Sequence, residues 1–347
     1  MVFAIDDYDT HEAIVFHQDR ASGLKAIVGI HNTRLGPALG GCRMWPYGSE
    51  QEAVTDVIRL SKGMTYKAAI SGLALGGGKS VIIGDPKTDK SPQLFRAMGR
   101  FIQSLGGRYL TAEDVGTTVE DLDFMREETP YARGTSGGSG NPSPATARGV
   151  YHGIRAAVRH RFGTDDLAGL RIAVQGLGNV GCVLADYLAK DGAKLIIADI
   201  DHDRIRRFTE QFGAEVASPE AVHGADVDVF APCALGAGIN DQTLPEIRAS
   251  IIAGSANNQL ATADHGQQLY RRGILYAPDY VINAGGLMDV AAEGPGYSEQ
   301  AVLQQVCGID QTLTEIFNRS EFQNVAPEVV ADQMAEERFN GTTQAAA

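Results

Sequence analysis

Residues 171–181 read "RIAVQGLGNVG", and this stretch decides the fold of the second half of the chain. Gly176, Gly178 and Gly181 form a G-x-G-x-x-G pattern directly after an apolar run, and residues 182–192 continue with helical character. The first glycine permits a tight turn, the second lets backbone approach a pyrophosphate, and the third lets the helix pack closely on the strand. The stretch therefore predicts a dinucleotide-binding strand–turn–helix unit, with the phosphates at the helix N-terminus.

The next apolar run, "KLIIADI" (194–200), carries Asp199 where an acid that binds ribose is expected. A carboxylate there accepts hydrogen bonds from the ribose hydroxyls and repels a 2′-phosphate, which favours NAD over NADP. Arg204 and Arg206 follow closely and weaken that preference. The alternative is a purely structural unit in which the acid stands by chance.

Apolar runs and helical segments alternate outward from this stretch, which is typical of an α/β protein with a doubly wound parallel sheet. The glycine-rich and serine-rich run at 135–144 is the predicted joint between two domains. Strands are expected at 24–30, 79–84, 108–114, 171–176, 194–200, 227–232 and 249–256, and helices at 50–64, 91–105, 143–163 and after about residue 303. Ser91 and Pro92 suit the start of a helix, and Gly106 suits its end.

These elements predict a domain at 1–134, a Rossmann-type domain at 135–324, and a C-terminal helix at about 325–347 that packs back on the first domain. The last residues, 340–347, are expected to fray.

The composition excludes several classes of protein. The chain has 347 residues, 44% of them hydrophobic and 21% charged, as in ordinary globular proteins. Its net charge of −13 argues against nucleic acid as a partner. It contains no apolar run of about 18 residues that could span a membrane, and its acidic start lacks the features of a signal peptide. The four cysteines form no C-x-x-C pair and the eight histidines are scattered, so we expect no metal and a cytoplasmic chain with reduced thiols.

A lysine follows three glycines in "LGGGKS", which raises the alternative of a phosphate-binding P-loop. Gly78, Lys79 and Ser80 fit the last three positions of that motif. Leu73 stands where the first glycine belongs, and the lysine precedes its strand instead of following it. The P-loop interpretation therefore fails, and Lys79 needs another role.

Charged residues among small ones indicate a reaction site in the first half. Lys67 and Lys79 are twelve residues apart, with a strand and a turn expected between them. Two lysines in one cleft would repel each other, and burial would desolvate them, so both effects favour a neutral amine. One could then bind a carboxylate while the other acts as a base, with Asp114 passing protons. The alternative is two surface lysines and a helix-capping aspartate.

Eight segments, taken in order, resemble the glutamate/leucine/phenylalanine/valine family of amino-acid dehydrogenases, and most closely its leucine members. The resemblance runs from about Leu24 to Ala292. Its segments are "RLGPALGGCRMWPY", "KGMTYKAA", "LGGGKSVIIGDP", "GRYLTAEDVGTTVED", "GNPSPATARGVY", "VQGLGNVG", "APCALGA" and "YAPDYVINAGGLMDV".

The resemblance implies oxidative deamination, in which an L-amino acid, NAD and water give a 2-oxo acid, ammonium and NADH. It implies that Lys67 binds the substrate carboxylate with help from the backbone of Gly40 and Gly41, that Lys79 activates water, and that Asp114 shuttles protons to and from the amino nitrogen. It also implies a cleft between the two domains and a homo-oligomer, usually an octamer.

The substrate pocket implied by the resemblance is apolar, which favours leucine, valine and isoleucine. Its expected lining is Leu39, Met64, Ala112, Leu287 and Val290. Leu39 stands where the glutamate members carry a lysine. The expected cofactor residues are Gly176, Gly178, Asn179, Val180, Gly181, Asp199, Thr146, Cys233, Ala234 and Asn257, of which Thr146 and Asn257 would orient the nicotinamide or the substrate.

Two residues depart from the family pattern. Arg133 replaces a small residue such as threonine, and Asp289 replaces a neutral one; the joint loop is also shorter than usual. Two alternative functions stay open: a dehydrogenase of phenylalanine or other aromatic amino acids with the same mechanism, and a non-catalytic NAD-binding protein that has kept the fold.

Overall fold

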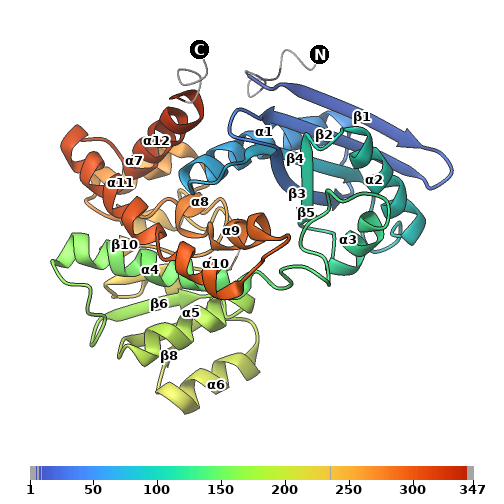
Figure 1. Ribbon diagram of the computed structural model, residues 1–347. Helices are drawn as coiled ribbons and strands as arrows, with labels where there is room; N and C mark the ends of the chain where they lie inside the picture. Colours follow the sequence, from blue (N-terminus) through green and yellow to red (C-terminus); the bar gives the residue numbers. More distant parts are fainter. Residues whose placement is uncertain (1–4, 6–7, 9, 235, 342–347) are drawn as a thin grey trace. The chain divides into compact units, whose positions relative to one another are not determined.

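The computed structural model describes residues 5, 8, 10–234 and 236–341, and it divides into two compact units (Figure 1). The first unit comprises the described residues up to Asn141, the segment Asp289–Ser298, and the described residues from Met334 onward. The second comprises Pro142–Met288 and Glu299–Gln333. None of the helices in the described part of the chain is long and apolar enough to cross a membrane.

A five-stranded sheet with the order β1-β2-β4-β3-β5 forms the centre of the first unit. β1 and β4 both run antiparallel to β2, and β3 runs parallel to β4 and β5. The strands are β1 (Ala13–Asp19), β2 (Leu24–Asn32), β3 (Ala38–Trp45), β4 (Gly76–Ile83) and β5 (Tyr109–Glu113), and the helices are α1 (Glu50–Ile70), α2 (Pro92–Ser104) and α3 (Val119–Arg126).

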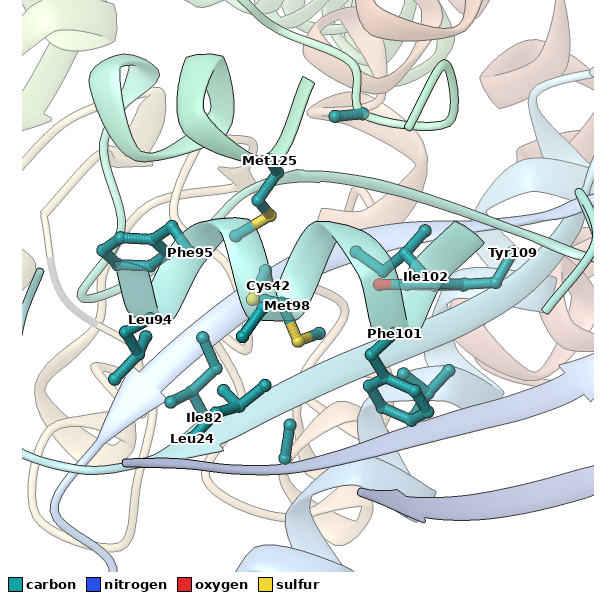
Figure 2. Packing of buried hydrophobic residues seen from close by; sticks show 14 of the residues in the cluster. Leu24, Cys42, Ile82, Leu94, Phe95, Met98, Phe101, Ile102, Tyr109 and Met125 are labelled. Carbon is teal, nitrogen blue, oxygen red and sulfur yellow. The ribbon is translucent and has the colours of Figure 1, made fainter. Parts of the chain in front are cut away.

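Both faces of this sheet are covered, because successive side chains of a strand point to opposite sides. Ile27 and Val81 pack against α1, whereas Val28 and Ile82 pack against α2. Figure 2 shows the α2 side, where the helix directs its apolar residues onto the strands. The labelled members of this cluster are Leu24, Cys42, Ile82, Leu94, Phe95, Met98, Phe101, Ile102, Tyr109 and Met125.

The structure confirms the predicted ends of two helices. Ser91 caps α2 by accepting a hydrogen bond from the Leu94 amide, Pro92 is its first residue, and Gly106 follows with a φ of 62°. α4 (Ser143–Phe162) ends at Gly163 in the left-handed conformation. α1 continues to Ile70, beyond the predicted end at residue 64.

Three predictions about the first unit were wrong. Strands β1 and β3 were not expected at all. Between Lys67 and Lys79 lie the end of α1, a turn and the start of β4, where a strand and a turn were expected. The glycines before Lys79 belong to strand β4 itself, whereas the predicted strand began at the lysine.

The second unit has a six-stranded parallel sheet with the order β11-β10-β9-β6-β7-β8. Counted along the chain this is the order 3-2-1-4-5-6 of a dinucleotide-binding fold, which confirms the predicted doubly wound sheet. The strands are β6 (Arg171–Gln175), β7 (Lys194–Ala198), β8 (Glu215–Val216), β9 (Val229–Pro232), β10 (Ile251–Ile252) and β11 (Leu275–Tyr276). The strand expected over 249–256 is thus only two residues long.

Helices connect these strands and form the C-terminal part of the chain. They are α5 (Asn179–Lys190), α6 (His202–Phe212), α7 (Ala263–Arg271), α8 (Asp279–Ile282), α9 (Gly285–Ala292), α10 (Glu299–Val306), α11 (Ile309–Gln323) and α12 (Pro327–Gly341).

The end of α12 belongs to the first unit, where it contacts the end of α1. The Arg338 guanidinium donates hydrogen bonds to the carbonyl oxygens of Ala69 and Ile70, and Tyr66 donates to Glu336 over 2.7 Å. The last carbonyls of a helix have no partner within it, so a cation there is stabilising. Residues 342–347, the main part of the tail predicted to fray, lie outside the described residues.

Candidate active site

Three consecutive glycines let strand β4 approach its neighbours more closely than any side chain would allow. A Cβ on Gly76 would lie 1.9 Å from the Asn32 carbonyl oxygen, and one on Gly77 would lie 2.0 Å from the Thr65 amide nitrogen of α1. The glycine run therefore serves the close packing of a strand. Its consequence is that Lys79, the next residue, is fixed in a rigid buried strand.

Lys79 and Asp114 form a buried ion pair at the centre of the first unit. The Lys79 side chain is 8% exposed and that of Asp114 18%, and the ammonium contacts the Asp114 Oδ2 atom. Lys79 comes from the middle strand β4 and Asp114 follows the edge strand β5, so two separate strands bring together the predicted base and the predicted proton shuttle.

Burial opposes ionisation of Asp114, but the charges of Lys79 and Arg43 outweigh it and hold the pKa of the carboxyl below its usual value. The Arg43 Nε atom lies 3.5 Å from the same Oδ2 atom. The other oxygen, Oδ1, accepts a hydrogen bond of 2.7 Å from the Val115 amide. The carboxylate is therefore ionised and held from both sides.

Gly40 and Gly41 lie in β3 beside this ion pair. A Cβ on Gly40 would be 1.7 Å from the Gly78 carbonyl oxygen, and one on Gly41 would be 2.7 Å from the Asp114 Cβ. The buried Tyr109 hydroxyl donates a 2.7 Å hydrogen bond to the Gly40 carbonyl. These contacts fix the backbone that was predicted to help bind the substrate carboxylate.

The remaining substrate residues are placed by several elements. Leu39 in β3 and Ala112 in β5 are buried, and Ala112 pairs directly with Gly41. Met64 and Lys67 are half-buried in the last turns of α1, which packs on β4. The other two predicted pocket residues lie in α9, with Leu287 in the second unit and Val290 in the first. The predicted pocket as a whole therefore stays a prediction.

The glycine loop of the second unit has the geometry that its pattern predicts. Gly176 has a φ of 95°, which a residue with a side chain rarely adopts. A Cβ on Gly181 would lie 2.0 Å from the Gly176 carbonyl oxygen, whereas one on Gly178 would meet nothing within 4 Å. The loop thus packs tightly at its third glycine and leaves space at its second. Gly178 is the N-cap of α5, whose first residues are Asn179 and Val180.

Asp199 follows β7 and lies against this loop. Its Oδ2 atom accepts a hydrogen bond from the Leu177 amide, and its Oδ1 atom accepts one of 2.8 Å from the Asp201 amide. Arg204 donates to the Leu177 carbonyl over 3.0 Å, and Arg206 pairs with Asp203 at 2.6 Å. Both arginines that complicated the choice of cofactor therefore have partners of their own.

The other predicted cofactor residues follow neighbouring strands or begin α4. Cys233 and Ala234 come directly after β9, and burial raises the pKa of the Cys233 thiol. Asn257 follows β10 and accepts a 2.7 Å hydrogen bond from the Asn283 side chain. Thr146, in the first turn of α4, donates to the Pro142 carbonyl over 3.1 Å. The carboxyl ends of parallel strands meet at one edge of a sheet, which is where such folds bind ligands.

The two residues that depart from the family pattern have defined partners within the first unit. Arg133 donates a hydrogen bond to the Glu293 carbonyl and lines a cavity of about 480 Å³ with Glu293 and Tyr297. Asp289 is buried and accepts a 2.7 Å hydrogen bond from the Tyr297 hydroxyl. Within the described ranges, no group of histidine, cysteine and acidic side chains could hold a metal ion.

Sequence reasoning missed two residues that hold the site, Arg43 and Tyr109. Arg43 is two positions after Gly41 in the same strand, so its side chain lies on the face of the sheet where a side chain at Gly41 would lie. That spacing could have identified Arg43 if β3 had been recognised as a strand. Tyr109 gave no comparable signal, because the partners of its hydroxyl, the Gly40 and Gly41 carbonyls and the Ser80 hydroxyl, lie far away in the sequence.

Comparisons with known proteins show what the chain is similar to. The family model described as "Glu/Leu/Phe/Val dehydrogenase, dimerisation domain" matches residues 10–131, and "Glutamate/Leucine/Phenylalanine/Valine dehydrogenase" matches 137–203 and 197–345. The chain is 54% identical to the leucine dehydrogenase of Bacillus cereus over 96% of its own length and 92% of the relative's. It is 46% identical to the phenylalanine dehydrogenase of Bacillus thermotolerans, over 95% and 88% of the two chains.

The crystal structure of L-tryptophan dehydrogenase from Nostoc punctiforme matches with a TM-score of 0.87 at 44% identity, covering 96% of this chain and 97% of that one. The two family models, the leucine dehydrogenase and the tryptophan dehydrogenase structure all match residues of both units. The chain therefore belongs to the glutamate/leucine/phenylalanine/valine dehydrogenase family.

Proposed function

We propose that this protein is an NAD-dependent L-amino-acid dehydrogenase that acts on leucine and, less selectively, on valine and isoleucine. The reaction converts the amino acid, NAD⁺ and water into the 2-oxo acid, ammonium, NADH and a proton. The observation that carries the proposal is the buried ion pair of Lys79 and Asp114 in a chain whose other unit has the glycine loop and Asp199.

Each protein group has a separate task in this proposal. When bound, NAD⁺ supplies the acceptor for the hydride that leaves the substrate Cα. Lys67 binds the substrate carboxylate beside the backbone of Gly40 and Gly41. Lys79, as the neutral amine, takes a proton from the water that attacks the imine carbon, and Asp114 carries protons to and from the amino nitrogen.

Two observations support leucine as the substrate. The leucine dehydrogenase of Bacillus cereus is more similar to this chain than the phenylalanine dehydrogenase of Bacillus thermotolerans, with 54% against 46% identity. Leu39 is buried and apolar beside the glycine pair, so no cation is offered there to a second carboxylate. One buried methylene is worth only about 0.8 kcal/mol, so leucine, valine and isoleucine should overlap as substrates.

The preference for NAD over NADP rests on Asp199. Two backbone amides hold its carboxylate beside the glycine loop, where a 2′-phosphate would meet a fixed negative charge. Arg204 and Arg206 are each paired with an aspartate, Asp201 and Asp203, and so are less suited to binding that phosphate.

A substrate panel tests the proposal directly. The purified protein is mixed with NAD at alkaline pH and L-leucine, L-valine, L-phenylalanine or L-glutamate, and NADH is followed by its absorbance. We expect fast reduction with leucine and valine and none with glutamate. A preference for phenylalanine would leave the mechanism in place and overturn the substrate. No reduction with any of the four, despite NAD binding, would favour the non-catalytic alternative.

A pair of lysine variants tests the role of Lys79. We expect Lys79→Ala to abolish turnover and to leave the dissociation constant of NADH unchanged, because the cofactor residues lie in the second unit. Lys87→Ala is the control, since Lys87 is an exposed lysine shortly after the same strand. Near-normal turnover of Lys79→Ala would contradict the proposed role.

We also propose a cytoplasmic homo-oligomer, and by the family resemblance an octamer. The description of the N-terminal family model as a dimerisation domain supports assembly through the first unit. Light scattering on the eluting peak of a sizing column measures the subunit number, and a monomer would overturn this proposal.

A further inference from the structure

Asp114 has a second cationic neighbour, Arg43, to which neither the predicted mechanism nor the family resemblance assigns a role. The Arg43 Nε atom lies 3.5 Å from Asp114 Oδ2, the same oxygen that contacts Lys79. The side chain of Arg43 is 22% exposed, so solvent screens this pair only partly. The carboxylate is thus placed between one cation that can lose its charge and one that cannot.

Arg43 is held in place from the side opposite Asp114. Its guanidinium donates a 2.8 Å hydrogen bond to Asp56 Oδ2 on α1, and the Tyr47 hydroxyl donates to the same oxygen over 2.7 Å. Arg59 binds the other oxygen of Asp56 at 3.1 Å. A side chain with anchors on both sides loses little further freedom when it interacts with Asp114, so this contact is preorganised.

The proposed chemistry creates a need for such a cation. Lys79 acts as a base only after its ammonium has released one proton to solvent, which removes the positive charge nearest to Asp114. A buried carboxylate without a counterion is strongly disfavoured and tends to take up a proton. Asp114 would then stop accepting protons at the moment when Lys79 becomes active.

We propose that Arg43 is a positioning residue of the reaction, the permanent cation that keeps the Asp114 carboxylate ionised and in place while Lys79 is the neutral base. The inference rests on the proposed function, because it takes Lys79 to be that base. Without Arg43, the proton released by Lys79 would be taken up by Asp114, so the active pair of neutral amine and ionised carboxylate would form only at higher pH.

The other titratable groups around Asp114 do not supply this charge. They are Cys42 on β3, Tyr47 after β3, and Tyr109 and Glu113 on β5. Burial raises the pKa of each of the four, for the Cys42 thiol to about 12. From α1, Asp56 contacts Arg43, and Lys67 is the predicted ligand of the substrate carboxylate.

The test is the pH profile of kcat/KM for L-leucine in Arg43→Gln, with Arg59→Gln as the matched control. Both arginines bind Asp56, but only Arg43 contacts Asp114. We expect the rising limb of the Arg43→Gln profile to move up by about one pH unit, which means about a tenfold loss at neutral pH that shrinks at high pH. Arg59→Gln should keep the wild-type profile, and Arg43→Lys should recover part of the shift.

Asp56→Asn provides a test of opposite sign that does not depend on Arg43→Gln folding. Removing the negative charge of Asp56 leaves the positive charge of Arg43 less compensated. The rising limb of the kcat/KM profile should therefore move to lower pH. A profile of unchanged shape with a uniform loss of activity in Arg43→Gln would overturn the proposal, as would an equal shift in Arg59→Gln. Either result would leave the proposed function intact if the wild type turns over leucine.

Chemical labelling of Lys79 needs no catalytic turnover, so it tests the role of Arg43 separately from the proposed dehydrogenase activity. The rate at which cyanate carbamoylates Lys79, divided by the concentration of the reactive cyanic acid at each pH, reports the fraction of neutral amine, and mass spectrometry locates the product. We expect the carbamoylation profile of Arg43→Gln to move to higher pH in the same way as the kinetic profile. Unchanged labelling would overturn the role of Arg43 even if the wild type proved to lack dehydrogenase activity.

Discussion

A glycine can be required because the protein leaves no room for a side chain, or because a ligand needs the space. The glycine loop after β6 contains a candidate for each case, Gly181 and Gly178. Gly181 has no room for a methyl group, because an added Cβ would lie 2.0 Å from the Gly176 carbonyl oxygen. Gly178 has room within the protein and an ordinary negative φ of −67°. We therefore expect its lack of a side chain to serve the predicted cofactor and not the fold.

Alanine variants separate these two reasons. We expect Gly181→Ala to lower the melting temperature, since forcing a methyl group into a packed site costs about 1–3 kcal/mol. Gly178→Ala should keep the wild-type melting temperature and weaken NADH binding, measured by fluorescence titration. The interpretation fails if Gly178→Ala binds NADH normally or if Gly181→Ala is as stable as the wild type.

Single residues of the site differ in how far the sequence could predict them. Lys79 and Asp114 could be predicted to share one site because each residue has a recognisable motif around it. Arg43 and Tyr109 could not, since their importance depends on contacts with Asp114 and Gly40, far away along the chain. Close packing between strands is decided by the whole sheet, and no local pattern reports it.

At the scale of elements, α12 begins with a carboxyl group that the fold does not satisfy. Glu328 lies in its first turn, and neither carboxyl oxygen has a hydrogen-bond partner among the described residues. Gly266 of α7 faces it so closely that an added Cβ would lie 2.0 Å from Glu328 Oε1. Burial raises the pKa of this carboxyl to about 7.

The raised pKa of Glu328 predicts a stability that falls as pH rises. Between its unfolded pKa near 4.5 and its folded pKa near 7, the folded state binds the extra proton, so stability decreases with pH until the full penalty applies above about 7. Glu328→Gln should therefore raise the melting temperature by a few degrees at pH 8, with much less effect at pH 5. The exposed Glu220→Gln is the control, and an equal gain at both pH values would contradict the charge argument.

Elements with strong local signals were predicted well, and those without them were not. Ser91, Pro92 and Gly106 mark the limits of α2 by chemistry that acts within a few residues. β3 was missed because "ALGGC" has small residues and no clear alternation, although the sheet buries it between β4 and β5. The predicted strand at β10 was too long. An apolar run indicates that residues are buried, but it does not indicate how many of them pair with a neighbouring strand.

At the scale of the molecule, the chain returns briefly to the first unit as Asp289–Ser298. This segment holds residues 133–139, which come shortly before the chain enters the second unit. Glu293 is 9% exposed, and its carboxylate accepts a hydrogen bond from the Gly134 amide, with the hydroxyls of Thr135 and Ser139 each 3.4 Å away. Its carbonyl accepts a hydrogen bond from Arg133. Gly138 completes the arrangement, because a Cβ there would overlap the carboxylate.

Limited proteolysis tests this arrangement. We expect Glu293→Ala to free residues 134–139 and to expose the Arg133–Gly134 bond to trypsin, so that a fragment ending at Arg133 appears early in the digest. The wild type and Glu299→Ala, a change at an exposed glutamate nearby, should resist cleavage there. Equal resistance of Glu293→Ala would show that other contacts hold the loop.

The chain passes between the two units after Asn141, Met288, Ser298 and Gln333, and the last part of the first unit begins only at Met334. A ribosome therefore synthesises the whole second unit before it supplies Arg338, whereas Glu293 is made before the last part of the second unit, Glu299–Gln333. The nascent first unit must wait with the carbonyl groups at the end of α1 still lacking Arg338. The end of α1, which carries Lys67, thus gains this contact only after residue 338 has been made, and a chain truncated before Met334 should lack it.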